Sequence, residues 1–284
     1  MKNKAIIGIS SYELTTEEVL LFQKYQPYGV ILFKRNCNNP TQLQALNRSI
    51  KTIIPDCKIF IDQEGGRVAR LRNPQFKEFP AAASLKSIEE VYKNYKEMGE
   101  YLYFLGIDAN CAPVADLYFD FASNIVGDRS FGSDVDRVTK FATAAAEGLL
   151  DGGIIPVIKH IPGHGRALVD SHLELPVVNT SLKDLEQTDF KVFKALKNFP
   201  LAMTAHIIYT ALDSEYPVST SKKSIDYIRN ELSFDGLIMC DDINMKALKG
   251  DLSSITKKIF NSGCDIVLHC SGKLEEMKQV LSSC

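Results

Sequence analysis

The sequence lacks the long apolar runs that would place it in a membrane or direct it to export. The N-terminal stretch Met1–Ile9 starts with basic residues, but its apolar run is too short for a signal peptide. No other run approaches the roughly 20 residues that a bilayer-spanning helix needs. We therefore expect a cytoplasmic protein with no membrane partner.

The chain also lacks a strong charge imbalance and paired cysteines. Its 33 Lys and Arg against 35 Asp and Glu give a formal net charge of −2, without blocks of like charge, which argues against a nucleic-acid partner. Seven cysteines, an odd number with no CxxC pair, indicate free thiols in a reducing compartment. No phosphate-binding loop, dinucleotide-binding glycine motif or Gly-x-Ser-x-Gly motif is present, and we expect no cofactor.

Short apolar runs separated by turn signals recur along the chain. Runs this short, without strict alternation, suit strands that are buried on both faces of a parallel sheet. Segments with helical spacing, such as Leu43–Ile53 and Val91–Leu102, lie between them. Eight such strands predict one (β/α)8 barrel domain over residues 1–284, with an open doubly wound sheet as the alternative. The runs are Ala5–Ile9, Gly29–Phe33, Cys57–Ile61, Ile107–Cys111, Ile154–Ile158, Leu201–Thr204, Gly236–Met239 and Asp265–His269.

Polar side chains follow these runs, at the strand ends where a barrel gathers its functional groups. A random scatter of charge would not track the strand ends in this way, so the pattern favours the barrel. The residues concerned are Asp62, Gln63 and Glu64 after the third run, Asp116 beyond the fourth, Lys159 and His160 after the fifth, His206 after the sixth, Asp241 and Asp242 after the seventh, and His269 at the end of the eighth.

The densest polar group is Lys159–Gly165, followed closely by Asp170–His172. Pro162 and two glycines exclude a regular helix there, so these groups belong to a shaped loop at a strand end. Asp170 and His172 are two residues apart and can point the same way in an extended loop. The carboxylate would then fix the imidazole tautomer and favour its charged form, which makes a workable general acid/base. A surface pair is the alternative.

A metal site is the obvious rival interpretation of these histidines. His160 and His164 are four apart, as zinc ligands often are on a helix. Pro162 and Gly163 remove the helix that would align them, and Lys159 puts a cation where the metal would sit. We therefore expect no metal.

Adjacent carboxylates, Asp241 and Asp242, follow the seventh run. Neighbouring side chains on an extended backbone point in opposite directions, so only one is expected to face a pocket while the other binds structure. The alternative is a cap for a helix that starts at Met245.

Several motifs together resemble glycoside hydrolase family 3, in its single-domain bacterial branch of cytoplasmic β-N-acetylhexosaminidases of cell-wall recycling. They occur in the expected order and span most of the chain, and they imply a (β/α)8 barrel. The motifs are Asp62-Gln63-Glu64-Gly65-Gly66-Arg67-Val68, Gly127-Asp128-Arg129-Ser130-Phe131-Gly132, Lys159-His160-Ile161-Pro162-Gly163-His164-Gly165 with Asp170-Ser171-His172, and Asp241-Asp242 before Met245.

The resemblance implies a role for each of these residues. Asp241 would be the nucleophile of a retaining mechanism, and His172, oriented by Asp170, would protonate the leaving oxygen and then activate water. The hydroxyls and N-acetyl group of the sugar would be held by Asp62, Arg70, Arg129, Lys159 and His160. The implied function is an exo-β-N-acetylglucosaminidase acting on N-acetylglucosamine-containing muropeptides.

Three other functions stay open at this stage: a phosphorylase on the same scaffold, a β-glucosidase-type enzyme of the family, and a non-catalytic sugar-binding protein. Only Leu274–Leu281 is left for a final helix, whereas members of this branch usually run longer. Barrel closure and the oligomeric state, a monomer or a weak homodimer, therefore stay open as well.

Overall fold

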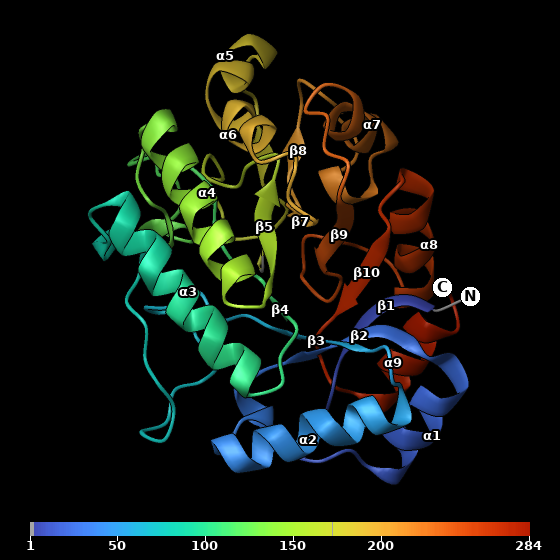
Figure 1. The fold of residues 1–284 in the computed structure, drawn as a ribbon. Coiled ribbons are helices and arrows are strands. Elements are labelled where there is room, and N and C mark those ends of the chain that lie inside the picture. Colours follow the sequence, from blue (N-terminus) through green and yellow to red (C-terminus); the bar gives the residue numbers. More distant parts are fainter. Residues whose placement is uncertain (1–2, 172) are drawn as a thin grey trace.

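The computed structural model describes residues 3–171 and 173–284 and contains a closed barrel of eight parallel strands (Figure 1). In chain order these strands are β1 (Asn3–Gly8), β2 (Pro27–Leu32), β3 (Lys58–Ile61), β4 (Ala109–Asn110), β5 (Ile155–Ile161), β7 (Leu201–Thr204), β9 (Leu237–Asp242) and β10 (Ile266–His269). Because β1 pairs with both β2 and β10, the ring closes. The predicted barrel is confirmed, and the open doubly wound sheet is wrong.

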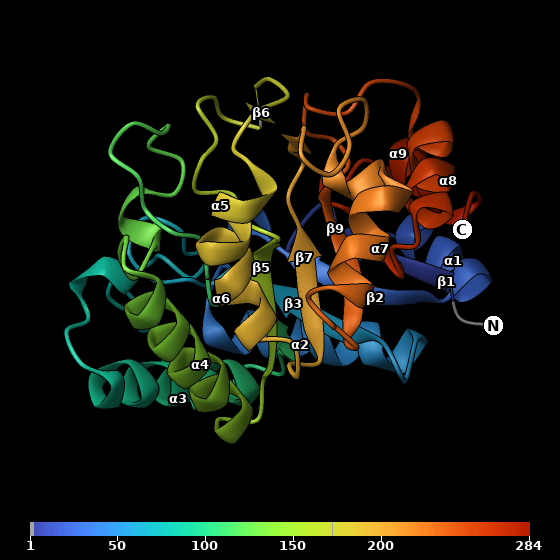
Figure 2. The same cartoon turned by 90° about the horizontal axis from the view of Figure 1, so that it is seen from above.

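Helices surround the barrel on its outside (Figures 1 and 2). They are α1 (Thr16–Tyr25), α2 (Pro40–Ile53), α3 (Ile88–Phe104), α4 (Val135–Asp151), α5 (Leu182–Gln187), α6 (Asp189–Ala195), α7 (Lys222–Asn230), α8 (Leu252–Ser262) and α9 (Leu274–Leu281). Short 3₁₀ turns are η1 (Lys34–Asn36), η2 (Ala82–Ser84), η3 (Gly127–Arg129) and η4 (Val218–Thr220). Since all barrel strands are parallel, their carboxyl ends open at one mouth.

Side-chain caps fix where several helices begin. The Thr15 hydroxyl accepts from the Glu18 backbone N–H at 3.1 Å, and a Glu18 carboxylate oxygen accepts from the Thr15 N–H at 2.9 Å. This reciprocal pair satisfies two N–H groups that the first turn leaves without helical partners. At the start of α3, the Ser87 hydroxyl accepts from the Glu90 N–H at 3.1 Å.

The barrel strands are buried on both faces, as their continuous apolar character predicts. Six of the seven residues of β5 are buried, and all four of β7 and of β10. The register at closure pairs Ala5 of β1 with Val267 of β10. The Asn3 side chain adds a hydrogen bond of 2.7 Å to the Leu281 carbonyl of α9. The helix Leu274–Leu281 is thus the last element packed at the closure, and the doubt about closure is resolved.

Beyond the barrel mouth, a small parallel sheet joins β6 (Val177–Val178) to β8 (Ile208–Tyr209). Figure 2 places β6 beyond the ends of β5 and β7, among the long loops. The sequence patterns above do not mark this sheet, because two-residue strands carry no periodicity. It ties the segment that follows the Lys159–Gly165 loop back to the body of the barrel.

No disulfide joins the cysteines in the part of the chain that the structure describes, and six of the seven are buried. They serve mainly as small apolar core residues, as predicted. In residues 3–171 and 173–284, none of the helices has both the length and the apolar character needed to cross a membrane.

Candidate active site

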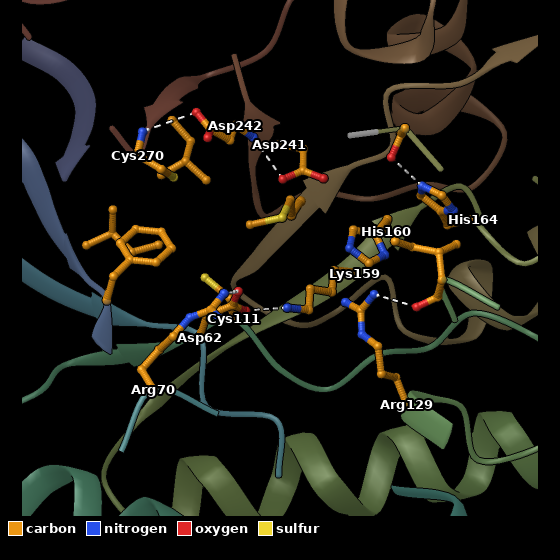
Figure 3. A pocket seen from close by; sticks show the side chains of 16 residues that line it. Asp62, Arg70, Cys111, Arg129, Lys159, His160, His164, Asp241, Asp242 and Cys270 are labelled. Carbon is orange, nitrogen blue, oxygen red and sulfur yellow. Dashed lines mark hydrogen bonds and ion pairs between the residues drawn. The ribbon is translucent and has the colours of Figure 1, made fainter. Parts of the chain in front are cut away.

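A cavity opens at the mouth of the barrel, and it brings together side chains from separate strand ends (Figure 3). All the residues expected to bind sugar, and the expected nucleophile, line this one cavity. They are Asp62, Arg70, Arg129, Lys159, His160 and Asp241. The parallel strands converge there, so residues up to 179 positions apart in the chain become neighbours, from Asp62 to Asp241.

Asp62, just after β3, bridges two cations. One carboxylate oxygen lies 2.5 Å from Lys159 Nζ and the other lies 2.5 Å from Arg70 Nη2. Burial alone would raise the pKa of Asp62, but the adjacent Lys159 and Arg70 hold it well below its usual range. Burial alone would likewise lower the pKa of Lys159, and the carboxylates facing it raise it above its usual range instead. Asp62 and Lys159 are therefore both charged at neutral pH.

Glu64 forms ion pairs with Arg129 and Lys159, two cationic side chains that line the cavity. Its carboxylate accepts two hydrogen bonds from Arg129, at 2.7 and 2.8 Å, and lies 2.5 Å from Lys159 Nζ. Glu64 is only 4% exposed and does not line the cavity. Removing its charge would leave two buried cations short of a partner, a change that costs about 3–5 kcal/mol in comparable buried networks. The sequence motif contains Glu64, but the sequence predicts no role for it.

Asp116 organises the histidines of the loop and is completely buried. One of its carboxylate oxygens lies 2.7 Å from His160 Nδ1, and the other accepts from the backbone N–H groups of His160 and His164 at 3.1 and 2.8 Å. Burial would raise the pKa of Asp116, but these contacts with His160 hold it below its usual range. With Nδ1 engaged, Nε2 is the His160 nitrogen that can address a ligand in the cavity.

His164 lies beside His160, with ring centroids 5.2 Å apart, and is 2% exposed. Burial, reinforced by the neighbouring His160, lowers the pKa of His164 to about 4. Its Nε2 lies 2.9 Å from the hydroxyl of Ser171. His164 is therefore a neutral hydrogen-bonding residue at neutral pH. Its role, and that of Ser171, are absent from the sequence prediction.

Asp241 and Asp242, at the end of β9, both line the cavity, so the expectation that only one would face it is wrong. Their roles still differ. Asp242 accepts at 3.1 Å from the backbone N–H groups of Asn244 and Cys270, and its own N–H donates to the Asp241 carboxylate at 2.8 Å. Burial raises the pKa of Asp242 to about 6. Asp242 thus braces the strand ends, and its backbone orients Asp241 (Figure 3). No helix starts at Met245; α8 begins at Leu252.

The expected acid/base pair falls on the loop after β5. Asp170 is half-buried there, and its carbonyl accepts from Leu173 N–H at 2.9 Å. His172 lies outside the described residues. At the start of the same loop, Arg166 Nε donates to the buried Asp189 carboxylate at 2.6 Å, and its guanidinium lies 4.3 Å from the ring centroid of Phe119. Arg166, which has no assigned role in the sequence prediction, therefore anchors the loop to α6.

Apolar side chains complete the cavity among the charged ones. One of them, Phe33, lies under the Arg70 guanidinium, 5.0 Å from ring centroid to Cζ. A cavity that combines charged hydrogen-bonding groups with apolar groups matches a sugar, which has hydroxyl edges and C–H faces. The apolar wall is formed by Ile31, Phe33, Ile125, Met203 and Leu268. Such a cavity can hold a sugar ring and present the Asp241 carboxylate to it.

No group of three or more His, Cys, Asp or Glu side chains is arranged to hold a metal within residues 3–171 and 173–284. His160 Nδ1 is already taken by Asp116, and Lys159 is charged beside it.

Residues 5–284 match the model of the glycosyl hydrolase family 3 N-terminal domain. The chain belongs to glycosyl hydrolase family 3. It is therefore a glycoside hydrolase, and the family resemblance of its motifs is confirmed.

Relatives and solved structures agree with this family assignment. A β-hexosaminidase of Haemophilus influenzae is 36% identical over 295 residues, covering 98% of this chain and 82% of the relative. A structure of NagZ from Neisseria gonorrhoeae with N-trifluoroacetyl-D-glucosamine has a TM-score of 0.90 and 29% identity, covering 99% of this chain and 88% of NagZ. That NagZ also has a structure with a zinc ion. A family 3 β-N-acetylglucosaminidase from a Paenibacillus species has a TM-score of 0.94 and 28% identity. The match covers 99% of this chain and 56% of that protein.

Proposed function

We propose that this family 3 hydrolase is a retaining exo-β-N-acetylglucosaminidase that releases N-acetylglucosamine from peptidoglycan-derived muropeptides. The observation that carries the proposal is the position of Asp241. Its carboxylate, oriented by the Asp242 N–H, lines the same cavity as the five residues expected to bind the sugar. The names of the relatives, β-hexosaminidase and NagZ, and the N-acylated glucosamine in the NagZ structure support the choice of sugar.

The cavity favours attack at the end of a sugar chain. Its floor is the packed interior of the barrel, which includes the fully buried Cys111. A terminal residue can enter with its ring against this floor, while the rest of the substrate leaves through the mouth. In the cavity, Asp62, Arg70 and Lys159 offer charged hydrogen bonds to hydroxyl groups, and Arg129 and His160 provide donors for the remaining hydroxyls and the N-acetyl oxygen.

The proposed reaction has two displacements at the anomeric carbon. Asp241 attacks to form a covalent glycosyl ester while His172, oriented by Asp170, protonates the departing oxygen. His172 then accepts a proton from the water that hydrolyses the ester. Asp170 helps the imidazole to hold its proton near neutral pH, as the first step requires. Residues 1–284 would act as one catalytic domain, as a monomer or a weak homodimer in the bacterial cytoplasm.

The stereochemistry and the acceptor test this proposal together. NMR of the product from an aryl β-N-acetylglucosaminide, recorded within the first turnovers, is expected to show free N-acetylglucosamine in the β configuration. An added phosphate buffer is expected to leave that product unchanged. N-acetylglucosamine 1-phosphate would instead identify a phosphorylase. That reaction is physically reasonable because a neutral imidazole base repels an incoming phosphate less than a carboxylate does. An α product would exclude two displacements, and no turnover would indicate a sugar-binding protein.

Chelation tests the expectation that no metal takes part. We expect EDTA treatment to leave the hydrolysis rate unchanged, because Pro162 and Gly163 interrupt any helix that would align His160 and His164 as ligands of one metal. The measurement is the rate before and after dialysis against EDTA, with the dialysed enzyme then given zinc as a control. Activity that is lost on chelation and recovered with zinc would show that the histidines serve a metal.

A further inference from the structure

A buried hydrogen bond crosses the loop that carries the proposed acid/base. His164 Nε2 lies 2.9 Å from Ser171 Oγ, and both residues are at most 2% exposed. Ser171 stands directly between Asp170 and His172 in the sequence. The contact therefore fixes the backbone directly next to Asp170.

The middle of the loop has few other buried anchors. Near Ser171, the side chains of Leu168 and Leu173 are 62% and 67% exposed. Other attachments lie before and after this part of the loop, among them Arg166 to Asp189 at 2.6 Å and the Ala167 carbonyl, which accepts from Ser123 N–H at 2.9 Å. At the start, Tyr209 donates to the Gly163 carbonyl at 3.0 Å, and at the end β6 pairs with β8. Among the described residues between Ala167 and Pro176, Ser171 is thus the buried one, and its contact sets where this part of the loop lies.

The partner of Ser171 is held by the sugar-binding side of the cavity. The His164 backbone N–H donates at 2.8 Å to Asp116, whose other carboxylate oxygen contacts His160 Nδ1. One carboxylate therefore positions both the residue expected to bind the sugar and the residue that anchors the loop. A displacement of the loop would therefore break or move the Ser171–His164 contact. That contact is linked through Asp116 to His160, the residue expected to bind the sugar.

The hydrogen-bond direction between His164 and Ser171 follows from what surrounds the ring. Among the described residues, His164 Nδ1 is buried without a hydrogen-bond partner. Leaving a bare nitrogen lone pair there costs less than burying an N–H without an acceptor, so the single proton of the neutral ring belongs on Nε2. His164 then donates and Ser171 accepts, which leaves the serine hydroxyl proton available to a group in the cavity that Ser171 lines.

We propose that Ser171, held by His164, is a positioning residue for proton transfer: it fixes the backbone of the loop that supplies the proposed acid/base to a sugar that His160 binds. This inference rests on the proposed function, because it assumes that His172 is the acid/base. Ser171 itself takes no proton and touches no reacting atom in the scheme. Its effect should therefore depend on how much the substrate needs an acid.

The test compares two leaving groups in Ser171→Ala. A disaccharide needs protonation of its leaving oxygen, whereas a dinitrophenyl glycoside does not. For the loss of one neutral hydrogen bond we expect kcat/KM to fall about fivefold to tenfold on the disaccharide. The first-turnover burst with the dinitrophenyl glycoside, and inhibition by free N-acetylglucosamine, should change less than about twofold. Ser171→Thr, which keeps the hydroxyl, should restore most of the disaccharide rate.

Two controls separate positioning from general damage to the fold. Ser262→Ala in α8 removes a buried serine hydroxyl that bonds the Ser219 and Ile259 carbonyls at 3.0 and 2.7 Å. It should affect both substrates equally or not at all. If Ser171→Ala does not fold, His164→Gln tests the same bond from its other side and should show the same selective loss.

Comparison with His172→Ala distinguishes the two possible failures. A selective loss in His172→Ala together with an equal loss, or no loss, in Ser171→Ala and His164→Gln would overturn the positioning role alone. The absence of a selective loss in His172→Ala would overturn the proposed acid/base, and the positioning role with it.

Discussion

Replacing Asp241 by alanine is expected to reduce the turnover of both a disaccharide and an activated aryl glycoside by on the order of 10⁴-fold or more. The carboxylate is the attacking group in the proposed first step, and a good leaving group cannot substitute for a missing nucleophile. The loss should therefore not depend on the leaving group. Circular dichroism should be unchanged, because Asp241 is partly exposed in the cavity and alanine leaves the backbone of β9 in place.

Labelling identifies the nucleophile independently of rate. A slow-reacting 2-deoxy-2-fluoro or 5-fluoro sugar should trap its glycosyl ester on Asp241, and peptide mapping should find the label there. Asp242→Asn is the matched control. The amide oxygen can still accept from the Asn244 and Cys270 N–H groups, so labelling should persist. A label on Asp242 would reverse the assignment of the two carboxylates.

Replacing His172 by alanine is expected to affect substrates unequally. General acid catalysis contributes on the order of 10²–10⁴ in rate, and only where the departing oxygen needs a proton. The rate on a disaccharide should fall by that factor, while the glycosylation step with an activated aryl glycoside should be nearly unchanged. Asp170→Ala should show a milder form of the same selectivity, because the imidazole remains but loses the carboxylate that orients it.

The measurement must separate the first turnover from the steady state. His172 also activates water in the second step, so steady-state turnover of the aryl substrate should be slow even where the first step is fast. The burst amplitude and rate in rapid-mixing experiments report the first step alone. An equal loss on both substrates within the burst would contradict the role of His172 as the acid.

The sequence was sufficient to predict the eight barrel strands because each strand carries its own signal. A run such as Ile154–Ile158 is short, apolar and followed by polar residues, and these local features predict a strand that is buried on both faces. Strands β6 and β8 were not predicted because each has only two residues, which is too short to show a periodic pattern. The equally short β4 was found only because it lies within the predicted run Ile107–Cys111. Closure could not be predicted either, since it depends on the pairing of β1 with β10 and not on any pattern within one of them.

The candidate site shows the same division between local and long-range information. Motif spacing placed Asp62, Lys159 and Asp241 at strand ends, and the structure brings these three to one cavity. The residues behind them were less accessible to prediction. Glu64 was part of a motif but its ion pair with Arg129, 65 positions away, depends on the folded arrangement of two loops. A second carboxylate close to a predicted strand end, such as Glu64 two residues after Asp62, is the sequence signal that could have found such supporting residues.

Closure of the ring between β1 and β10 has a consequence for synthesis on the ribosome. β1 ends at Gly8 and β10 begins at Ile266, so at 5–20 residues per second roughly 10 to 50 s separate the two strands. Until β10 emerges, β1 and β9 each keep one unpaired edge, the kind of surface that recruits other chains. The Cys270 N–H that holds Asp242 is also missing during this time. A nascent chain that stalls before Ile266 would therefore expose two unpaired strand edges beside an incomplete pocket. We expect such a chain to bind chaperones and to have no activity.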